Sequence, residues 1–372
     1  MIRIDRRLFA HFDVVLMLLI LLICTMAFFN LYSASFPPKG GATPYIRQGY
    51  FFLMALCAFL FVISFDYQAL HTWNYPIYGL VIILLILAET VGNTAGGAQR
   101  WIDLGFFKLQ PSEPAKLMLI ITLASYFSRR EASDGYSIKD LVVPGILTGV
   151  PFILILLQPD LGTALMLVII AGSMAMFVKL RFSTYVILGT IALGLGVFAW
   201  EKVLKPYQKQ RIFTFLEPEK DPMGHGYQVL QSKIAVGSGG KFGKGYLEGT
   251  QGHLSFLPER HTDFAFSVWG EEWGFTGSLI LIGVYFFLIL WGLYVAMHAK
   301  DRFGVLLAFG VVSLIFWQAV INLCMVLGFL PVVGIPLPLF SYGGSSLMTT
   351  MIGLGILMNV RMRRFPSSLA RE

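Results

Sequence analysis

The sequence predicts an all-α, polytopic membrane protein. Hydrophobic residues fill 56% of its 372 positions, whereas charged residues fill only 13%. A soluble domain of this size keeps mostly polar residues on its surface, so this composition is typical of a chain surrounded by lipid. The apolar residues also fall in long runs, and a run of about 17–25 residues is the length of helix that crosses a bilayer.

About ten apolar runs have this character. They cover residues 13–33, 45–65, 75–91, 113–128, 142–157, 162–178, 184–200, 275–297, 303–327 and 344–360. An even number of spans places both termini on one side of the membrane. Basic residues in short loops mark the cytoplasmic side. The loops on the side of the termini carry most of them, including Arg129, Arg130, Lys179, Arg181, Lys300, Arg302, Arg361 and Arg363.

We therefore predict cytoplasmic termini and a single membrane domain over residues 1–372. The net charge of +7 comes from these loops and gives no reason to expect a nucleic-acid partner. The three cysteines, Cys24, Cys57 and Cys324, lie inside apolar runs without metal-site spacing, so they are interpreted as packing residues.

Residues 201–274 form one long loop, which is predicted to be extracytoplasmic. It is too short for an ordinary independent domain, and we expect short amphipathic helices near 207–216 and 227–236. Its glycine-rich centre does not match a nucleotide-binding P-loop, because Lys244 is followed by glycine instead of serine or threonine. Phosphate binding by Lys244 and a plain flexible loop are both left open here.

The end of this loop concentrates polar chemistry. Glu259, Arg260, His261 and Asp263 fall within five positions of a chain that has few charges. One interpretation is a solvated loop that leads into a helix, with Asp263 near the positive end of the helix dipole. The other is an active site facing the outside of the membrane.

Glu113 and Lys116 stand three residues apart at the start of an apolar run, so they share one helix face. Ionisable groups at membrane depth usually face a bundle interior, a partner group or a water-filled cavity. Two interpretations are equally open. Lys116 reaches outward to the lipid headgroups while Glu113 caps the helix, or Lys116 points inward to an anion such as Asp263.

Six separated motifs, in order along nearly the whole chain, resemble those of the SEDS family (shape, elongation, division and sporulation), and most closely its RodA branch. They are Arg100-Trp-Ile, Gln110-Pro-Ser-Glu-Pro-Ala-Lys116, Gln158-Pro-Asp-Leu-Gly-Thr163, Phe256-Leu-Pro-Glu-Arg-His-Thr-Asp-Phe264, Gly270-Glu-Glu-Trp-Gly274 and Phe340-Ser-Tyr-Gly-Gly-Ser-Ser346.

The resemblance implies a peptidoglycan glycosyltransferase that polymerises lipid II on the outer face of the cytoplasmic (inner) membrane for cell elongation and rod shape. It also implies a class B penicillin-binding protein, a transpeptidase, as partner, together with other membrane proteins of the elongation complex. Asp263 would be the catalytic aspartate, with Lys116 as its salt-bridge partner and Glu113 close by. Further substrate-binding candidates are Arg100, Trp101, Gln110, Arg211, Lys244, His261, Ser341 and Ser345.

In this hypothesis Asp263 is a general base that takes the proton of a sugar hydroxyl, and cations neutralise the leaving diphosphate. Lys116, Arg100 or a divalent cation such as Mg²⁺ would face that diphosphate. A lysine beside Asp263 would lower its pKa and weaken it as a base. Either the pair separates on substrate binding, or Asp263 positions the hydroxyl or a metal.

Two functions of other classes compete with the transferase. A lipid II flippase would also have about ten spans and intramembrane charge, but it needs polar groups along a path through the bilayer. A scaffold that only recruits the transpeptidase would tolerate the loss of Asp263.

Overall fold

Each of the ten predicted apolar runs is a helix in the computed structural model. The structure describes residues 11–36, 43–91, 93–95, 98–103, 105, 108–130, 132, 134–217, 225–250 and 259–364. The ten helices are α2 (Val14–Ala34), α3 (Pro44–Ser64), α4 (Gln68–Val91), α5 (Ser112–Ser128), α6 (Val142–Leu157), α7 (Leu161–Phe177), α8 (Phe182–Phe198), α12 (Ala265–Met297), α13 (Arg302–Val326) and α14 (Gly344–Met362).

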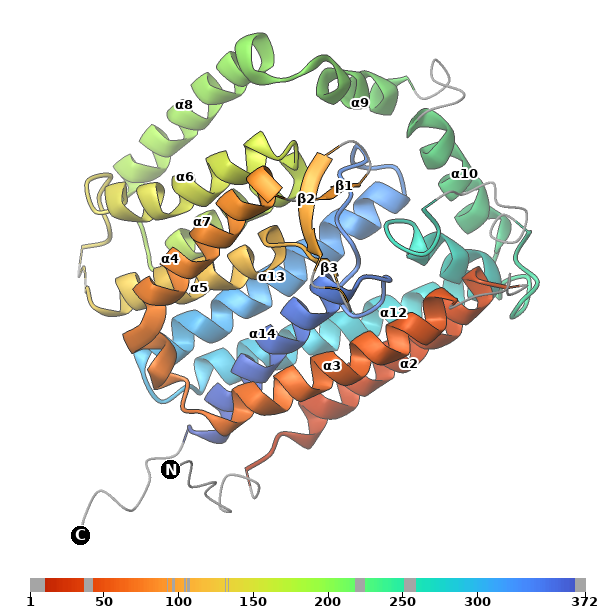
Figure 1. The fold of residues 1–372 in the computed structure, drawn as a ribbon, viewed down its shortest axis with the longest axis horizontal. Helices are drawn as coiled ribbons and strands as arrows, with labels where there is room; N and C mark the ends of the chain where they lie inside the picture. The colour runs from red at the N-terminus through yellow and green to blue at the C-terminus, as the bar shows by residue number, and fades with distance from the viewer. Residues whose placement is uncertain are drawn as a thin grey trace.

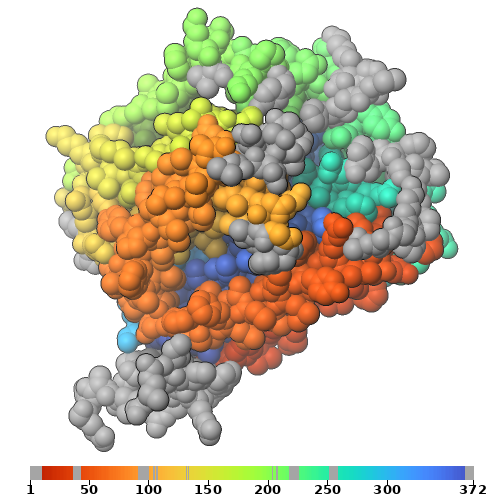
Figure 2. Space-filling model, viewed as in Figure 1, coloured from red at the N-terminus to blue at the C-terminus, as the bar shows by residue number. Residues whose placement is uncertain are grey.

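Six helical stretches in the described residues are long and apolar enough to cross a membrane, and α6 and α7 are shorter apolar helices. The chain is therefore a multi-pass membrane protein. The bundle is organised around α5, α13 and α14, which are mostly buried. By contrast, α8 lies at the edge of the bundle, and only Thr184 of its residues is buried (Figure 1). In the space-filling view α14 is visible in a hollow between α3 and α4 (Figure 2).

The long loop holds the two predicted amphipathic helices, α9 (Pro206–Leu216) and α10 (His225–Ser238), after a π-helical turn, η1 (Ala199–Val203). Its predicted end at residue 274 falls inside α12, which begins at Ala265. Gly274, at φ 64°, breaks the regular helical backbone inside α12. The predicted apolar run at 275–297 begins directly after this kink. Residues 218–224 and 251–258, which include the start of the Phe256–Phe264 motif, lie outside the described residues.

A small sheet accompanies the predicted helices. The strands are β1 (Asn93–Ala95), β2 (Ala98–Asp103) and β3 (Lys108–Leu109), in the order β1-β2-β3 with both pairs antiparallel. They lie between α4 and α5 along the chain. The strands are short, so no alternating pattern is long enough to predict them from sequence.

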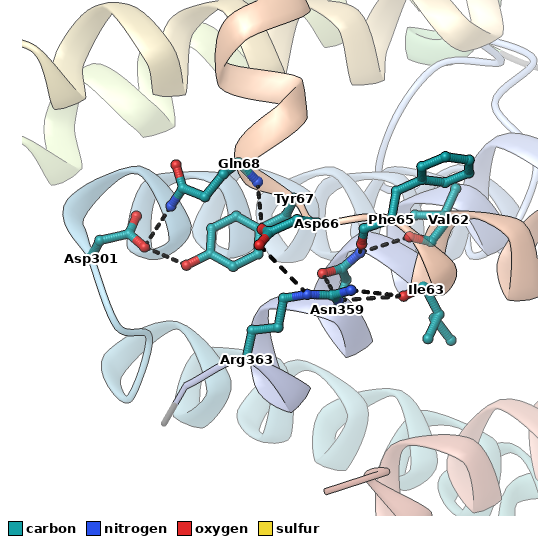
Figure 3. A network of polar contacts seen from close by, with 9 residues as sticks. All are labelled: Val62, Ile63, Phe65, Asp66, Tyr67, Gln68, Asp301, Asn359 and Arg363. Atoms are coloured by element: carbon teal, nitrogen blue, oxygen red, sulfur yellow. Dashed lines mark hydrogen bonds and ion pairs between the residues drawn. The ribbon is translucent and has the colours of Figure 1, made fainter. Parts of the chain in front are cut away.

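Both ends of the described chain meet at one end of the bundle. Asp13, which caps α2, binds Arg361 of α14 at 3.1 Å. Nearby, Asn359 donates hydrogen bonds to the carbonyls of Val62 (2.7 Å) and Phe65 (2.6 Å). In the same network Arg363 reaches the α3–α4 turn, and Tyr67 and Gln68 bind Asp301, the residue that caps α13 (Figure 3).

Candidate active site

A polar cavity of about 540 Å³ lies at the other end of α14. The first turns of α5, α7 and α14 reach it through Glu113, Leu161 and Ser345, and the segment just before α12 contributes Asp263. Each helix N-terminus carries a partial positive charge from its free N–H groups. Four helices that begin around one cavity therefore favour an anionic ligand such as a phosphate.

Asp263 is held at this cavity through its backbone. Asn322 of α13 is fully buried, and its amide donates to the carbonyls of Asp263 (2.9 Å) and Ile335 (2.8 Å). Gly334, at φ 76°, lies opposite the carboxylate: a Cβ there would stand 3.5 Å from Asp263 Oδ2. These contacts leave the Asp263 side chain facing the cavity that it lines.

The pKa of Asp263 is raised to about 6, chiefly by burial and then by the negative charge of Glu259, whereas Arg211 opposes the shift. Glu259 also lines the cavity, and its carboxylate accepts a 2.9 Å hydrogen bond from the Thr262 hydroxyl. A carboxylate with a pKa near neutral is suited to general-base catalysis, because it is ionised at working pH yet still basic.

Two arginines supply positive charge to the cavity. Arg100, on β2, donates from Nε to the carbonyl of Gln158 at 2.8 Å and from a terminal nitrogen to that of Pro159. Arg211, on α9, donates to the carbonyl of Val332 at 3.4 Å and lowers the pKa of Asp263 through its charge. Both arginines line the cavity on which the helix N-termini converge.

A series of hydrogen bonds fixes the wall of the cavity formed by the starts of α5, α7 and α14. Asp160 caps α7 and accepts from Thr163 (3.0 Å) and from the Gln110 amide (3.2 Å). The backbone N–H of Gln110 donates to the Ser345 hydroxyl at 3.1 Å, and Ser345 donates to the carbonyl of Lys108 at 2.9 Å. The start of α5, the α6–α7 link and the start of α14 are thereby tied together.

Lys116 points inward but does not pair with Asp263. Its ammonium binds Glu113 Oε1 at 2.7 Å, with side-chain exposures of 2% and 5%. The three-residue spacing puts the two groups on one helix face, so the nearest carboxylate satisfies the lysine. The predicted Lys116–Asp263 ion pair is therefore wrong for this structure. The conflict between a neighbouring lysine and a basic aspartate disappears with it.

The structure brings only part of the predicted set together. Cavity-lining residues from that set are Arg100, Trp101, Gln110, Glu113, Arg211, Asp263 and Ser345.

Three other predicted residues have different surroundings. Lys244 binds Glu271 of α12 at 2.6 Å. Ser341 is buried and accepts from the Leu337 N–H at 2.9 Å. His261 accepts at its main-chain oxygen from Tyr342, while burial and the charge of Arg260 lower the pKa of its ring to about 4.

Sequence reasoning missed Asn322, and it left Asp160, Glu259 and Tyr342 out of the site. Asn322 had one available signal, since an amide inside an apolar run needs a hydrogen-bond partner in the bundle. Among the described residues, no three His, Cys, Asp or Glu side chains are grouped so that they could hold a metal ion.

The family model for the FtsW, RodA and SpoVE cell cycle proteins matches residues 13–365. The chain belongs to this family, the SEDS family. The resemblance found in the six motifs is thus confirmed.

Curated relatives support the same assignment over nearly the full length. The peptidoglycan glycosyltransferase MrdB of Escherichia coli K12 is 39% identical over 95% of this chain and 94% of its own. The peptidoglycan glycosyltransferase RodA of Treponema pallidum is 34% identical over 95% of this chain and 98% of its own.

Solved structures share the fold of this SEDS protein. A chain from a study of how a peptidoglycan synthase complex coordinates polymerization and crosslinking superimposes with a TM-score of 0.82 at 35% identity, covering 96% of this chain and 99% of its own. The crystal structure of the rod shape determining protein RodA of Thermus thermophilus gives 0.72 at 31% identity, covering 96% and 98%. The all-α polytopic fold predicted from the sequence is confirmed.

Proposed function

We propose that the polar cavity joins lipid II units into glycan strands by an inverting transfer in which Asp263 is the general base. The broader activity follows from the family: the chain is a SEDS peptidoglycan glycosyltransferase that polymerises glycan strands, like its MrdB and RodA relatives. The observation that supports the proposed role of Asp263 is a carboxylate with a pKa of about 6 in a cavity that also holds two arginines.

The proposed reaction is a single displacement at the anomeric carbon, with Asp263 as the base. The acceptor hydroxyl attacks the anomeric carbon of the donor sugar, and its proton passes to Asp263 as the new C–O bond forms. The bond from the anomeric carbon to the diphosphate breaks, and the diphosphate leaves with the electron pair. A single displacement of this kind inverts the anomeric carbon. Proton removal by a positioned base typically accelerates such a step by about 10²–10⁴-fold.

The leaving diphosphate needs positive charge but no proton. Arg211 and Arg100 provide it, assisted by the N-termini of α5, α7 and α14. Lys116 is excluded from this role in the present structure because Glu113 neutralises it. Mg²⁺ is commonly held by one or two carboxylates together with substrate phosphates, and Glu259, which lines the cavity, would suit that arrangement while Asp263 stays free to accept the proton. Inhibition by EDTA tests it.

The cavity is proposed to open on the outer face of the inner membrane. Asp13 and Arg361 place both ends of the described chain at one end of the bundle, and the cavity lies at the start of α14, the other end. A helix of 19 residues is about 28 Å long, which is close to the hydrocarbon thickness of a bilayer. The basic loops lie with the termini, so that end is assigned to the cytoplasm.

The flippase alternative lacks a path of charged groups through the central helices α5 and α13. Below the Glu113–Lys116 pair, α5 carries no charged residue from Leu117 to Phe127, and neither does α13 from Phe303 to Val326. Charges gather at the cavity and at the opposite end of the bundle. A transferase needs only the charges at the cavity.

A class B penicillin-binding protein is the proposed partner, with other elongation-complex membrane proteins around it. The similar solved chain comes from a complex described as coordinating polymerization and crosslinking. Crosslinking of new strands is a transpeptidase reaction, so a polymerase of this fold is expected to work beside one.

The test is purified protein, with and without the transpeptidase, supplied with lipid II and assayed for polymer on a gel. Wild type and Asp103→Asn, an exposed aspartate outside the cavity, should both make polymer. Asp263→Asn should make none while keeping the wild-type elution profile. Translocation of labelled lipid II across vesicles without any polymer would instead favour the flippase.

A further inference from the structure

A second cavity, of about 360 Å³, lies between α2, α3 and the loop before α14. Its size falls within the range of about 300–1,000 Å³ that is usual for small-molecule pockets. We propose that it binds the polyprenyl chain of one of the two lipid-linked sugars that polymerisation joins. This inference rests on the proposed function and adds to it a site for a substrate tail.

The lining of this cavity fits a hydrocarbon chain. Leu21, Cys24, Thr25 and Phe28 of α2 line it at spacings of three and four residues, so they form one helix face. On α3 the wall includes Gly49, where a Cβ would meet no atom within 4 Å. The space is therefore open where the two helices could otherwise touch.

The cavity is also open toward the lipid. Leu21, Phe28 and Phe29 line it and are 39%, 45% and 50% exposed. They belong to α2, a candidate membrane span, so the environment that meets them is the hydrocarbon core. A ligand that enters from this side is a lipid chain, and small residues such as Gly49 let it approach the helix backbone closely.

One loop separates this cavity from the active site. Leu339 and Leu347 line the apolar cavity, whereas Gly343 and Ser345, between them in sequence, line the polar one. Gln48 of α3 joins the two sides, because its side chain accepts from the Gly343 N–H at 3.3 Å and donates to the Ser341 carbonyl at 3.4 Å. A diphosphate in the polar cavity would thus lie one loop away from its own tail in the apolar one.

The backbone of this loop is strained where it meets the cavity. Leu339 has φ 64°, a conformation that residues with a Cβ rarely adopt. Its buried side chain lines the apolar cavity. Strain of this kind is usually retained at functional sites.

The chemistry of polymerisation explains why a tail site is needed here. Donor and acceptor both carry a polyprenyl chain, and both sugars must meet at Asp263. Two tails therefore reach the same end of the bundle at once, and each needs its own track. Lipid gives a tail no hydrophobic gain on leaving the bilayer, so the track must hold it by packing, which a preformed cavity provides.

The test fills the cavity without altering the active site. Gly49→Leu places a side chain in the open space, and Gly79→Leu is the matched control, because Gly79 is also half-buried on an apolar helix with no atom near its Cβ and does not line the cavity. Polymerisation is measured with lipid II and with an analogue that carries a farnesyl chain.

For Gly49→Leu we expect KM for the undecaprenyl substrate to rise about fivefold, equivalent to about 1 kcal/mol. KM for the farnesyl analogue should match wild type, and Gly79→Leu should match wild type with both substrates. An unchanged KM of Gly49→Leu for lipid II, or an equal rise with both chain lengths, would overturn the inference.

Native mass spectrometry separates a polyprenyl chain from an ordinary membrane lipid. Gly49→Leu should lose bound undecaprenyl phosphate and keep bound phosphatidylglycerol. Loss of phosphatidylglycerol alone would assign the cavity to a membrane phospholipid and contradict the proposal. Absence of polymer from wild type with either substrate would be a failure of the proposed function, which is a different result.

Discussion

The buried ion pair between Glu113 and Lys116 is expected to stabilise the fold around the site and to take no part in the reaction. The two side chains are almost fully buried, their charged atoms are 2.7 Å apart, and Glu113 Oε2 has no hydrogen-bond partner among the described residues. Lys116→Met would leave a buried carboxylate without its cation. Breaking a buried pair in this way costs about 3–5 kcal/mol.

Removing both charges should restore stability. In Glu113→Gln/Lys116→Met no uncompensated charge remains, and replacement of a whole buried pair by neutral groups is often neutral in free energy. Thermal unfolding in detergent should therefore rank wild type and the double variant together, with Lys116→Met well below both. Lys139→Met, at an exposed lysine, should unfold like wild type. A Lys116→Met protein as stable as wild type, or a double variant no better than the single one, would refute the reasoning.

Three further predictions concern stability. The pKa of Asp263 is raised from 3.8 to about 6, so ionisation of this carboxyl destabilises the fold as pH rises through this range. Above pH 6, Asp263→Asn should therefore unfold at a higher temperature than wild type, and below pH 3.8 the two proteins should unfold at the same temperature. A lower unfolding temperature for Asp263→Asn above pH 6 would be inconsistent with burial of the carboxylate. At Gly243, φ is 85° and a Cβ would stand 2.0 Å from the Glu272 carbonyl, so Gly243→Ala should cost about 1–3 kcal/mol in thermal unfolding, whereas Gly237→Ala, with open space, should cost nothing. Asn359→Leu leaves the carbonyls of Val62 and Phe65 without their donor and should cost about 1–3 kcal/mol by the same measurement; an unchanged unfolding temperature would show that these bonds contribute nothing.

The spans could be predicted because a bilayer sets a minimum length for an apolar run. The run at 142–157, for example, coincides with α6 (Val142–Leu157). The kink at Gly274 was hidden because the residues before it, from Ala265, are helical although they include Glu271 and Glu272. Their partners, such as Lys244 and Ser33, come from distant segments, and one sequence does not show such pairings.

The candidate site was predictable in its aspartate and only partly in its surroundings. The charge cluster and the family motifs identify Asp263, and the three-residue spacing puts Glu113 and Lys116 on one face. Spacing alone does not show that Lys116 forms its ion pair with Glu113. Because the lysine is paired there, it does not lower the pKa of Asp263. Asn322, from a helix far along the chain, binds the main chain of Asp263 and lies in a run that is mostly apolar.

The most direct test of the general-base assignment is the pH dependence of kcat/KM for polymerisation of lipid II. The structure predicts that kcat/KM of the wild type rises through a single ionisation near the Asp263 pKa of about 6, because only the ionised carboxylate accepts the hydroxyl proton. Folded Asp263→Asn should show no polymerisation at any pH. A flat wild-type profile, or an Asp263→Asn protein that polymerises at the wild-type rate, would contradict the assignment.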